Sequence, residues 1–399
     1  MKYVVVLGDG MADHPVRKLG GRTPLEEAHK PNLDSLAREG EMGMLKTVPQ
    51  GMPPGSDVAN LSILGYRPER CYTGRGPLEA ADIGVRLGPR DVAFRCNLIT
   101  EREGRMHDYS AGHITTEEAA ELLGELNRRF RFGEFHVGIT YRHVFVLRNC
   151  DPRLETDPPH EIPGEPIRNH LIRPPSDPLA RRLNRLMLES KRILSEHPVN
   201  RAREMQGKNP ANMIWLWSQG GRPRLQSFRR KYGLRAALIS AVPLIRGIGV
   251  YTGMTLIRVP GATGYFDTNY EGKALYALRA LEDHDFVYVH VEAPDEAGHE
   301  GNVEMKVKAI EDLDRRLLGP LLDGLPEDCR VAVLPDHPTP LEVKTHVAEP
   351  VPFVMRGPGL GKDNLTFSER NGARGSAGSL EGEQFMLKLL GLRPSPGPR

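Results

Sequence analysis

The sequence has few cysteines and no long apolar run, and each shortage excludes a class of protein. Its 399 residues include four cysteines, and none of them has the CxxC spacing of a zinc or redox site. These cysteines, which we expect to be free thiols in a reducing cytosol, are Cys71, Cys96, Cys150 and Cys329. No segment approaches the roughly 18 apolar residues that a membrane-spanning helix requires. The N-terminal run YVVVL is also too short for the core of a signal peptide.

The chain is almost without net charge. Its 54 lysines and arginines balance 52 acidic residues, so no global field attracts it to a nucleic acid or a membrane. We therefore expect a soluble, cytoplasmic protein with neither of those partners, and homo-oligomerisation stays open. The length leaves room for two domains and a large core.

Apolar strands and amphipathic helices alternate in both terminal parts of the sequence. Continuous apolar runs predict strands over residues 3–7, 286–291, 330–334 and 352–355. Apolar residues at helical spacing predict helices over residues 24–39, 303–318 and 381–391. This alternation predicts an α/β fold with a mostly parallel sheet and helices on both faces.

The middle of the sequence has a different character. Its segments AFRCNLI and FHVGITYRHVFVLRN predict strands, and TTEEAAELLGELNRRF predicts a helix. We therefore predict an α+β domain over residues 89–231, inserted between core parts over residues 1–88 and 232–399. Residues 168–231 hold 15 basic against 4 acidic residues. A solvated helix face, a nucleic-acid surface or a lid that presents arginines to an anionic substrate would explain this excess, although sparse aromatics argue against nucleic acid.

Acidic residues and histidines follow three of the apolar runs. The segments VVVLGDG, VYVHVEAPDEAGH, VAVLPDH and KTHVAEPVP contain Asp9, Asp295, His299, Asp336, His337 and His346. In an open α/β sheet, sites form at the carboxyl ends of the strands. Carboxylates and imidazoles together are suitable ligands for a divalent metal. The pattern therefore predicts that these segments converge on one metal site.

The segment GMPPGSDVANLSILGY places Ser56 at the start of a predicted helix. A serine in this position is commonly an N-cap, whose side chain accepts a hydrogen bond from the backbone. The same geometry directs backbone N–H groups toward an anion. Beside a metal, the serine oxygen could also be a nucleophile. The two interpretations are compatible, and the Asp/His set favours the nucleophile.

Together these motifs resemble one enzyme family over nearly the whole chain. They are Asp9, the PGS turn at Ser56, YTGRGPLEA (72–80), EAPDEAGH (292–299), the Asp336–His337 pair and THVAEPVPF (345–353). In this order they are similar to the archaeal-type 2,3-bisphosphoglycerate-independent phosphoglycerate mutases of the alkaline phosphatase superfamily. The resemblance implies a phosphatase-like metal-binding core with an inserted substrate-binding cap. It also implies an isomerase of glycolysis and gluconeogenesis that interconverts 2- and 3-phosphoglycerate.

The resemblance further implies a phosphoserine at Ser56 and two divalent metal ions, without 2,3-bisphosphoglycerate. The implied ligands are Asp9, Ser56, Asp336 and His337 for one ion, and Asp295, His299 and His346 for the other. Manganese is the first expectation for both ions, with cobalt, zinc or magnesium as alternatives.

The residues that would contact the substrate, and the identity of that substrate, have more than one interpretation. By resemblance, His113, Arg142 and Arg246 would bind substrate, although each also has a structural explanation. A metal-dependent phosphatase, or another phosphotransferase such as a phosphopentomutase, would use the same core ligands. A non-catalytic binding protein with a relic site is a further alternative, which the complete ligand set argues against.

Overall fold

The computed structural model describes residues 1–150 and 153–393, and these residues form two compact units. The first unit consists of Met1–Tyr72 together with the chain from Arg224 onward, and the second consists of Thr73–Pro223. The second unit is therefore an insertion within the sequence of the first.

The first unit is built on a sheet that has eight strands within the described residues. In spatial order these are β13 (Gly378–Glu381), β2 (Glu41–Lys46), β12 (Val351–Arg356), β11 (Cys329–Leu334), β1 (Lys2–Gly8), β10 (Phe286–Val291), β8 (Ala236–Ile239) and β9 (Thr255–Ile257). Only β12 runs antiparallel to its two neighbours, so the sheet is mostly parallel, as the sequence predicts. The central strands are buried along their length and consist largely of valine, leucine and alanine, which is usual where a parallel sheet is covered on both sides.

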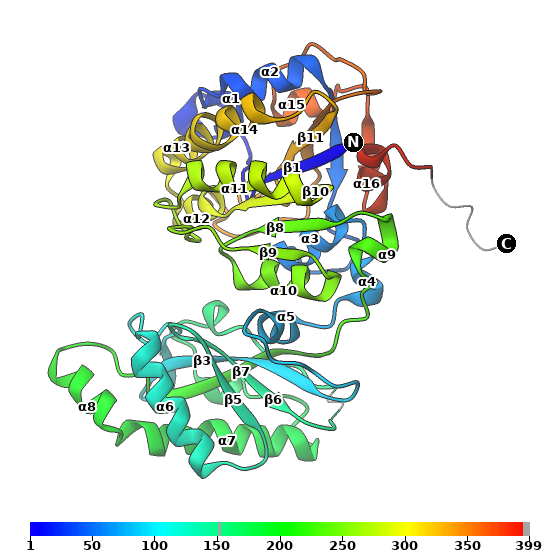
Figure 1. Ribbon diagram of the computed structural model, residues 1–399. Coiled ribbons are helices and arrows are strands. Elements are labelled where there is room, and N and C mark those ends of the chain that lie inside the picture. The colour runs from blue at the N-terminus through cyan, green and yellow to red at the C-terminus, as the bar shows by residue number, and fades with distance from the viewer. Residues whose placement is uncertain (151–152, 394–399) are drawn as a thin grey trace. The chain divides into compact units, whose positions relative to one another are not determined.

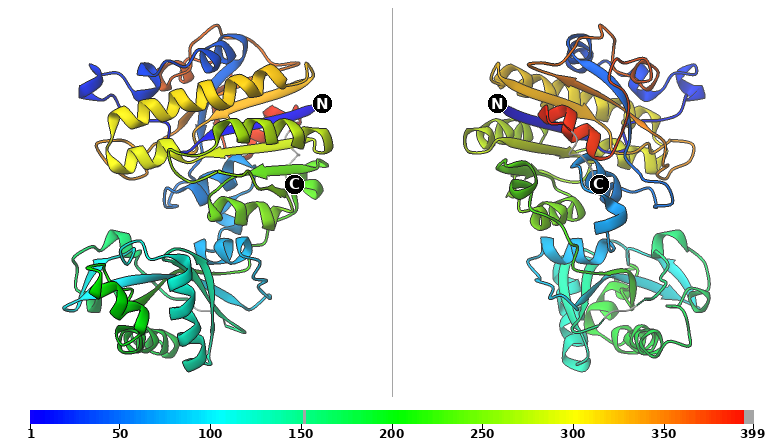
Figure 2. Two further views of the ribbon diagram at one scale, coloured as in Figure 1. Left: turned by 60° about the vertical axis from the view of Figure 1, so that its left-hand side comes forward. Right: turned by 90° about the vertical axis from the view of Figure 1, so that its right-hand side faces the viewer.

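Helices cover both faces of this sheet (Figure 1; Figure 2). The helices packed around the core that includes Val4 and Val287 are α1 (Pro24–Glu27), α2 (Pro31–Glu39), α11 (Tyr270–Asp283), α13 (Val303–Asp312), a π-helical turn (Leu313–Leu318) and α14 (Gly319–Gly324). Residues Tyr3 and Tyr288 point to the opposite face, where their hydroxyls bond to Leu390 and Asn60. The helices of that face are α3 (Ser56–Ile63), α10 (Pro243–Thr252) and α16 (Glu383–Leu390). The other α-helices of this unit are α4 (Pro68–Cys71), α9 (Phe228–Tyr232), α12 (Ala293–Glu300) and α15 (Glu369–Gly372).

Two predicted helices differ from the observed ones. The helix predicted over residues 24–39 is divided into α1 and α2, because Pro31 keeps the preceding Lys30 out of the helical conformation. The helix predicted over residues 303–318 ends its regular α-helical part at Asp312 and continues through the π-helical turn. Neither difference changes which face is buried.

The second unit is an α+β structure whose sheet has five strands in the part of the chain that the structure describes. Its strands are β3 (Val92–Arg102), β4 (Arg105–Asp108), β5 (Glu134–Ile139), β6 (Arg142–Leu147) and β7 (Met213–Gly221). Strand β3 pairs with β4, β6 and β7, and all pairs are antiparallel. Its helices are α5 (Arg75–Asp82), α6 (Thr116–Arg129), α7 (Pro178–Ser195) and α8 (Pro198–Met205).

The inserted unit begins and ends earlier than residues 89 and 231, the boundaries that the sequence suggested. Helix α5 belongs to it, because Gly76 lies against the backbone of Ala93 in β3 and the amide of Arg75 donates to the Ser218 hydroxyl in β7. The basic segment 168–231 therefore extends across the boundary between the units. Within it, α7 exposes arginines along its outer face, as expected for a solvated basic helix.

Two further observations concern the cysteines and the apolar character of the helices. Within the described residues, none of the four cysteines forms a disulfide bond. In the described residues, no helix combines the length and the apolar character needed to cross a membrane.

Candidate active site

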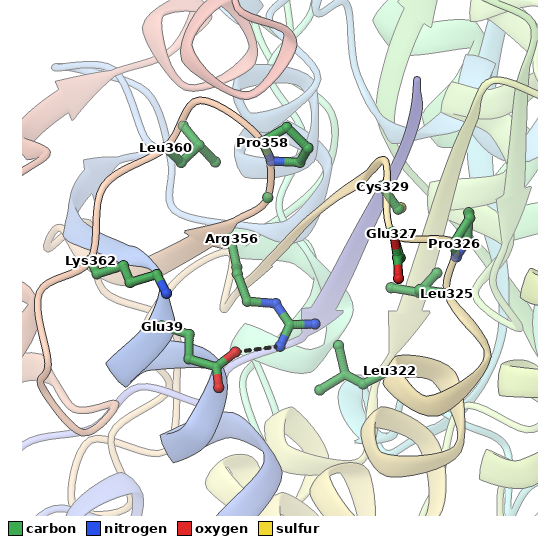
Figure 3. A pocket seen from close by; sticks show the side chains of 11 residues that line it. Glu39, Leu322, Leu325, Pro326, Glu327, Cys329, Arg356, Pro358, Leu360 and Lys362 are labelled. Atoms are coloured by element: carbon green, nitrogen blue, oxygen red, sulfur yellow. Dashed lines mark hydrogen bonds and ion pairs between the residues drawn. The ribbon is translucent and has the colours of Figure 1, made fainter.

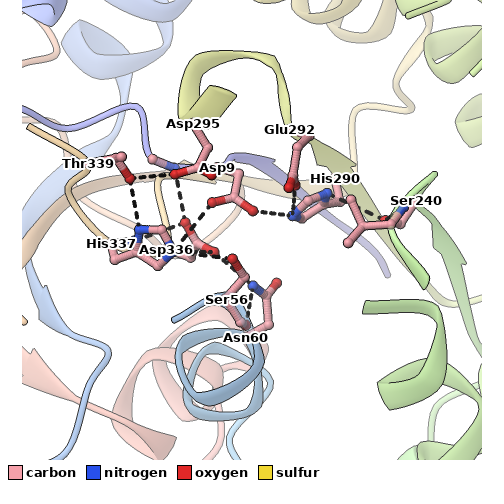
Figure 4. Close-up of polar contacts among 12 residues, drawn as sticks. Asp9, Ser56, Asn60, Ser240, His290, Glu292, Asp295, Asp336, His337 and Thr339 are labelled. Carbon is pink, nitrogen blue, oxygen red and sulfur yellow. Dashed lines mark hydrogen bonds and ion pairs between the residues drawn. The ribbon is translucent and has the colours of Figure 1, made fainter. Parts of the chain in front are cut away.

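Three adjacent parallel strands deliver carboxylates to one edge of the first unit's sheet. Asp9 follows β1, Asp295 lies in α12 just beyond β10, and Asp336 follows β11. Because β1 lies between β11 and β10, these three segments are neighbours in space. All three carboxylates are buried (Figure 4). The convergence follows from the topology, since parallel strands end at the same edge.

Ser56 lies at the first position of helix α3, next to these carboxylates. The N-cap of α3 is Gly55, and within the described chain the Ser56 side chain makes no capping hydrogen bond. The Ser56 hydroxyl instead lies 3.2 Å from His337 Nε2 (Figure 4). The N-cap interpretation of this serine is therefore wrong, and its oxygen faces the Asp/His cluster.

Asp336 is held by hydrogen bonds from three directions. Its Oδ2 accepts from the Asn60 side-chain amide at 2.9 Å, and its Oδ1 accepts from the backbone amides of Gly10 and His337 at 3.2 and 2.9 Å. Asn60 in turn accepts from the buried Tyr288 hydroxyl at 2.6 Å. This chain of contacts fixes the orientation of the carboxylate before any ligand binds.

A second group gathers around Asp295. His299 Nε2 lies 3.1 Å from Asp295 Oδ2 and 2.9 Å from His346 Nε2, and His346 Nε2 lies 3.5 Å from Asp295 Oδ1. The hydroxyl of Thr339 donates to Asp295 Oδ1 at 2.5 Å and lies 3.3 Å from His337 Nδ1. Thr339 thus connects this group to the one around Asp336.

The acidic side chains have strongly shifted pKa values. Burial raises the pKa of Asp9 well above its ordinary value, and the negative charges of Asp336 and Glu292 add to the shift. Burial and the charge of Asp295 raise the pKa of Glu292 to about 8. Burial also acts on Asp295, but the neighbouring His346 and His299 outweigh it and hold its pKa well below its ordinary value. The cluster therefore concentrates negative charge that a cation would stabilise.

The histidines divide into two kinds. Burial lowers the pKa of His337 to about 4 and that of His290 to about 3, so both imidazoles are neutral at pH 7. Burial would also lower the pKa of His299, but its hydrogen bond to Asp295 and the charge of that residue raise it to about 9. His299 must therefore lose a proton before it can bind a metal.

The donor set fits divalent metal ions. Ligand atoms within 4.8 Å of one another occur in the groups Asp9–Asp336–His337, Asp295–His337–His346 and Asp9–His290–Glu292. Asp9 Oδ1 is buried and accepts no hydrogen bond from any described residue, although His337 Nε2 lies 3.5 Å away. An orphaned buried carboxylate oxygen is costly unless a cation or a proton satisfies it. The seven predicted ligand residues lie together, with His337 between the two groups.

Sequence reasoning missed several residues that touch this cluster. They are Asn60, His290, Glu292 and Thr339. In the segment VYVHVE, alternation at period two places Tyr288 and His290 on one strand face, with Glu292 two residues on. This alternation could have predicted that His290 and Glu292 lie on the same side as Tyr288. The apolar residues around them made the segment resemble a strand of the hydrophobic core.

The predicted substrate residues fall in both units. His113 and Arg142 lie in the second unit, where both contact the ring of Tyr141. The Arg142 guanidinium donates to the Tyr141 hydroxyl at 3.0 Å. The side chains of His113 and Arg142 are exposed. Arg246 lies in α10 of the first unit and is half-buried.

Further cations of the second unit lie near Arg142. Arg95 is buried, bonds to Glu79 at 3.1 Å and lies over the ring of Trp217 at 4.5 Å. Burial lowers the pKa of Arg95, and the positive charges of Arg142 and Arg75 lower it further. Arg75 and Arg142 lie near this buried Arg95–Glu79 pair, and their guanidinium groups are of the kind that binds a carboxylate or phosphate.

A separate hollow lies at the end of the first unit's sheet where β11 begins, away from the carboxyl end of β11 that leads to Asp336 (Figure 3). It has a volume of about 360 Å³ and is lined by residues near the start of β11 and the end of β12. Its Arg356 guanidinium bonds to Glu39 at 3.0 Å. Because this cation is already paired with an acid, the hollow does not offer the convergent polar groups of the Asp9 region.

Comparison of the sequence with known proteins gives one consistent result. The sequence model described as 2,3-bisphosphoglycerate-independent phosphoglycerate mutase matches residues 37–200. A protein of Methanothermobacter thermautotrophicus named 2,3-bisphosphoglycerate-independent phosphoglycerate mutase 2 is 53% identical over 98% of this chain and 97% of its own length. A protein of that general name from Methanothrix thermoacetophila is 52% identical over 98% of this chain and the whole of its own length.

Two solved structures are similar to this chain over nearly its whole length. A protein from Pyrococcus horikoshii matches with a TM-score of 0.85 and 31% identity, over 100% of this chain and 99% of that one. The structure named cofactor-independent phosphoglycerate mutase from Thermoplasma acidophilum matches with a TM-score of 0.66 and 30% identity, over 98% of this chain and 99% of that one. The fold described above is therefore shared with both.

Proposed function

Because the chain belongs to the family of 2,3-bisphosphoglycerate-independent phosphoglycerate mutases, we propose that it interconverts 2- and 3-phosphoglycerate through a phosphoserine at Ser56. The observation that carries this proposal is the position of the Ser56 hydroxyl, 3.2 Å from His337 Nε2 at the start of α3. A helix N-terminus presents backbone N–H groups and a positive dipole end to a phosphate. This position supports the proposal that Ser56 accepts the phosphoryl group and that the helix N-terminus holds it.

The proposed metal ligands are those implied by the family resemblance. Asp9, Ser56, Asp336 and His337 would hold one divalent ion, and Asp295, His299 and His346 the other. When bound, such ions neutralise phosphoryl oxygens and lower the pKa of a coordinated hydroxyl. The family resemblance makes Mn²⁺ the first expectation. Carboxylates with imidazoles fit Mn²⁺, Co²⁺ or Zn²⁺, whereas Mg²⁺ prefers oxygen ligands alone.

Phosphoryl transfer through Ser56 occurs in two steps. In the first, the Ser56 oxygen forms a bond to phosphorus, the bond from phosphorus to the substrate oxygen breaks, and the serine proton replaces phosphorus on that oxygen. In the second, the other glycerate hydroxyl attacks the phosphoserine and returns the proton to Ser56. No bisphosphorylated cofactor is consumed. Burial of Ser56 and Asp336 keeps bulk water from these groups.

Retention of glycerate decides whether the enzyme acts as a mutase or as a phosphatase. If glycerate leaves before the second step, water hydrolyses the phosphoserine and free phosphate results. We assign the retention to His113, Arg142 and Arg246, with Arg95 in support, because guanidinium groups bind carboxylates in a planar, bidentate manner. The gathering of Arg75, Arg95 and Arg142 in the second unit supports this assignment.

The substrate also suggests where the enzyme acts. Phosphoglycerates are intermediates of glycolysis and gluconeogenesis, so we place this enzyme in the cytoplasm with those pathways. The finding that none of the described helices is suited to cross a membrane is compatible with this location.

Replacement of Ser56 tests the phosphoserine directly. Ser56→Ala should abolish mutase activity and should yield no phosphopeptide around residue 56 after incubation with 3-phosphoglycerate and acid quenching. Ser62→Ala is the matched control, since Ser62 is buried in the same helix and does not contact the Asp/His cluster. It should keep both activity and the phosphopeptide. Activity of Ser56→Ala comparable to that of Ser62→Ala would exclude the phosphoserine route.

A further inference from the structure

A fully buried lysine lies close to the proposed metal ligands and has no part in the proposed mechanism. Lys306 belongs to α13, and its side chain has no contact with solvent. Its ammonium donates to Asp13 Oδ2 at 2.7 Å and to the backbone oxygens of Ala12 and Thr339 at 3.2 and 2.8 Å. These three acceptors use all three N–H donors of the ammonium. Because a buried donor without an acceptor is costly, the ammonium keeps the three acceptors together.

The three acceptors belong to two segments that carry proposed metal ligands. Ala12 and Asp13 lie in the segment that follows Asp9 after β1, and Thr339 lies three residues beyond Asp336 after β11. The Thr339 amide also donates to the Ala12 backbone oxygen at 3.3 Å, so the two segments run side by side. Since Asp9 and Asp336 are proposed ligands of the same ion, the spacing of these segments sets the distance between two of its ligands.

Lys306 itself extends from the third segment that carries proposed ligands. Helix α13 comes directly after α12, which contains Asp295 and His299. Thr339, whose backbone oxygen accepts from Lys306, donates through its hydroxyl to Asp295 Oδ1 at 2.5 Å and lies 3.3 Å from His337 Nδ1 (Figure 4). One buried ammonium is therefore connected to all three segments and, through Thr339, to both groups of ligands.

Asp13 supplies the negative charge that this buried ammonium requires. Its carboxylate is also buried, and it accepts from the backbone amides of His14 at 2.8 Å and of Leu341 at 3.2 Å. Leu341 belongs to the segment after β11, so Asp13 also joins the two segments. Loss of one partner would leave the other charge buried and unpaired, whereas loss of both charges would not.

We propose that Lys306 and Asp13 are a positioning pair for the metal site, which holds the segments after β1 and β11 against α13 and thereby sets the spacing of the ligands. This inference rests on the proposed function in one respect, namely that these ligands bind two divalent ions. Neither Lys306 nor Asp13 is a proposed ligand. The pair therefore acts through the backbone of the two segments and through the Thr339 hydroxyl.

Two variants of the full-length protein separate positioning from stability. Lys306→Met keeps the length of the side chain but removes the ammonium, and Lys306→Met/Asp13→Asn removes both charges. We expect the Mn²⁺ affinity, measured by calorimetric titration of the chelated protein, to fall about 10- to 100-fold in both, because the segments are no longer held together. Urea unfolding should show that the double variant regains much of the stability lost in the single one, since no unpaired charge stays buried. The double variant also serves if Lys306→Met folds poorly.

Lys30→Met is the matched control in the same unit. Lys30 is also buried, and its ammonium bonds to Asp34 at 2.9 Å, outside the segments that carry the proposed ligands. This variant should lose stability and keep the wild-type Mn²⁺ affinity.

Three results would contradict the positioning role and leave the proposed function intact. They are wild-type Mn²⁺ affinity in Lys306→Met, recovery of wild-type affinity together with stability in the double variant, and an equal loss of affinity in Lys30→Met. A wild-type protein that binds no Mn²⁺ would instead overturn the proposed two-metal site, and this inference with it.

Discussion

Asn60 connects the buried Tyr288 hydroxyl to the carboxylate of Asp336, and its removal offers a sharp test of how the site is held. Its amide donates to Asp336 Oδ2 at 2.9 Å and to the Ser56 backbone oxygen at 2.8 Å. Its oxygen accepts from Tyr288 at 2.6 Å. The side chain is fully buried. Asn60→Ala therefore deletes three hydrogen bonds without replacing a proposed metal ligand.

The expected cost follows from these contacts. Loss of the bond to the charged Asp336 carboxylate is worth about 1.5–3 kcal/mol, and a buried Tyr288 hydroxyl left without its partner costs about 1–3 kcal/mol more. Together these contributions predict that Asn60→Ala lowers the free energy of unfolding by about 2.5–6 kcal/mol. Without its side-chain donor, Asp336 should also lose its fixed orientation. Outer contacts of this kind are worth about 10- to 100-fold in metal affinity, and we expect a loss of that size for Mn²⁺.

Asn200 provides a matched control in the second unit. It is also fully buried, donates to the backbone oxygens of Leu194 and Ala211, and accepts from the Ala211 amide. Urea unfolding should show a loss of stability for Asn200→Ala comparable to that of Asn60→Ala. Calorimetric titration with Mn²⁺ should nevertheless give wild-type affinity for the Asn200 variant.

The comparison separates a positioning role from a merely structural one. If Asn60→Ala binds Mn²⁺ as tightly as the wild type while it is equally destabilised, Asn60 serves stability only and the reasoning is wrong. Tyr288→Phe should have a smaller effect of the same direction, because Asn60 keeps its bond to Asp336.

Two further predictions concern acidity and the substrate clamp. Below about pH 9, Mn²⁺ affinity should fall up to about tenfold per pH unit, because His299, with a pKa of about 9, must lose its proton to become a ligand. Titration calorimetry in buffers of different ionisation enthalpy measures this proton release, and an affinity independent of pH would contradict it. Arg142→Ala and Arg246→Ala should lower mutase turnover by about 30-fold or more and raise the ratio of phosphate released to product, with partial rescue by lysine. Arg129→Ala serves as a surface control. If Arg142→Ala and Arg246→Ala keep the kinetics and the product ratio of this control, the residues that retain glycerate lie elsewhere.

The elements that position the site were largely predictable because their sequence patterns are local. The strands before Asp9 and Asp336 are continuous apolar runs, and parallel strands bring their carboxyl ends together. The break before Pro31 was also visible, because proline restricts the preceding residue, but the helical spacing across residues 24–39 concealed it. The boundary of the inserted unit was not visible, since membership of α5 depends on contacts with the distant strand β7.

The contacts of the site itself depended on distant residues and could be predicted only in part. Ser56 was correctly placed at the start of a helix, but only the tertiary contact with His337 shows that its hydroxyl is not used as a cap. His290 and Glu292 lie in or beside an apolar strand, so their meeting with Asp9 follows from the pairing of β1 with β10 rather than from local spacing.

The residues proposed for phosphoryl transfer all lie in the first unit, whereas two of the three residues proposed to retain glycerate lie in the second. Every proposed metal ligand, and Ser56, belongs to the first unit, so phosphoryl transfer to the serine requires no ligand from the insertion. That set alone would serve a phosphatase equally well, since fold and metal ligands do not determine the substrate. The difference must come from groups that retain the dephosphorylated intermediate, and two of the residues proposed for this role, His113 and Arg142, belong to the second unit. Substitutions around Tyr141 should therefore alter the fate of the phosphoserine more than its formation.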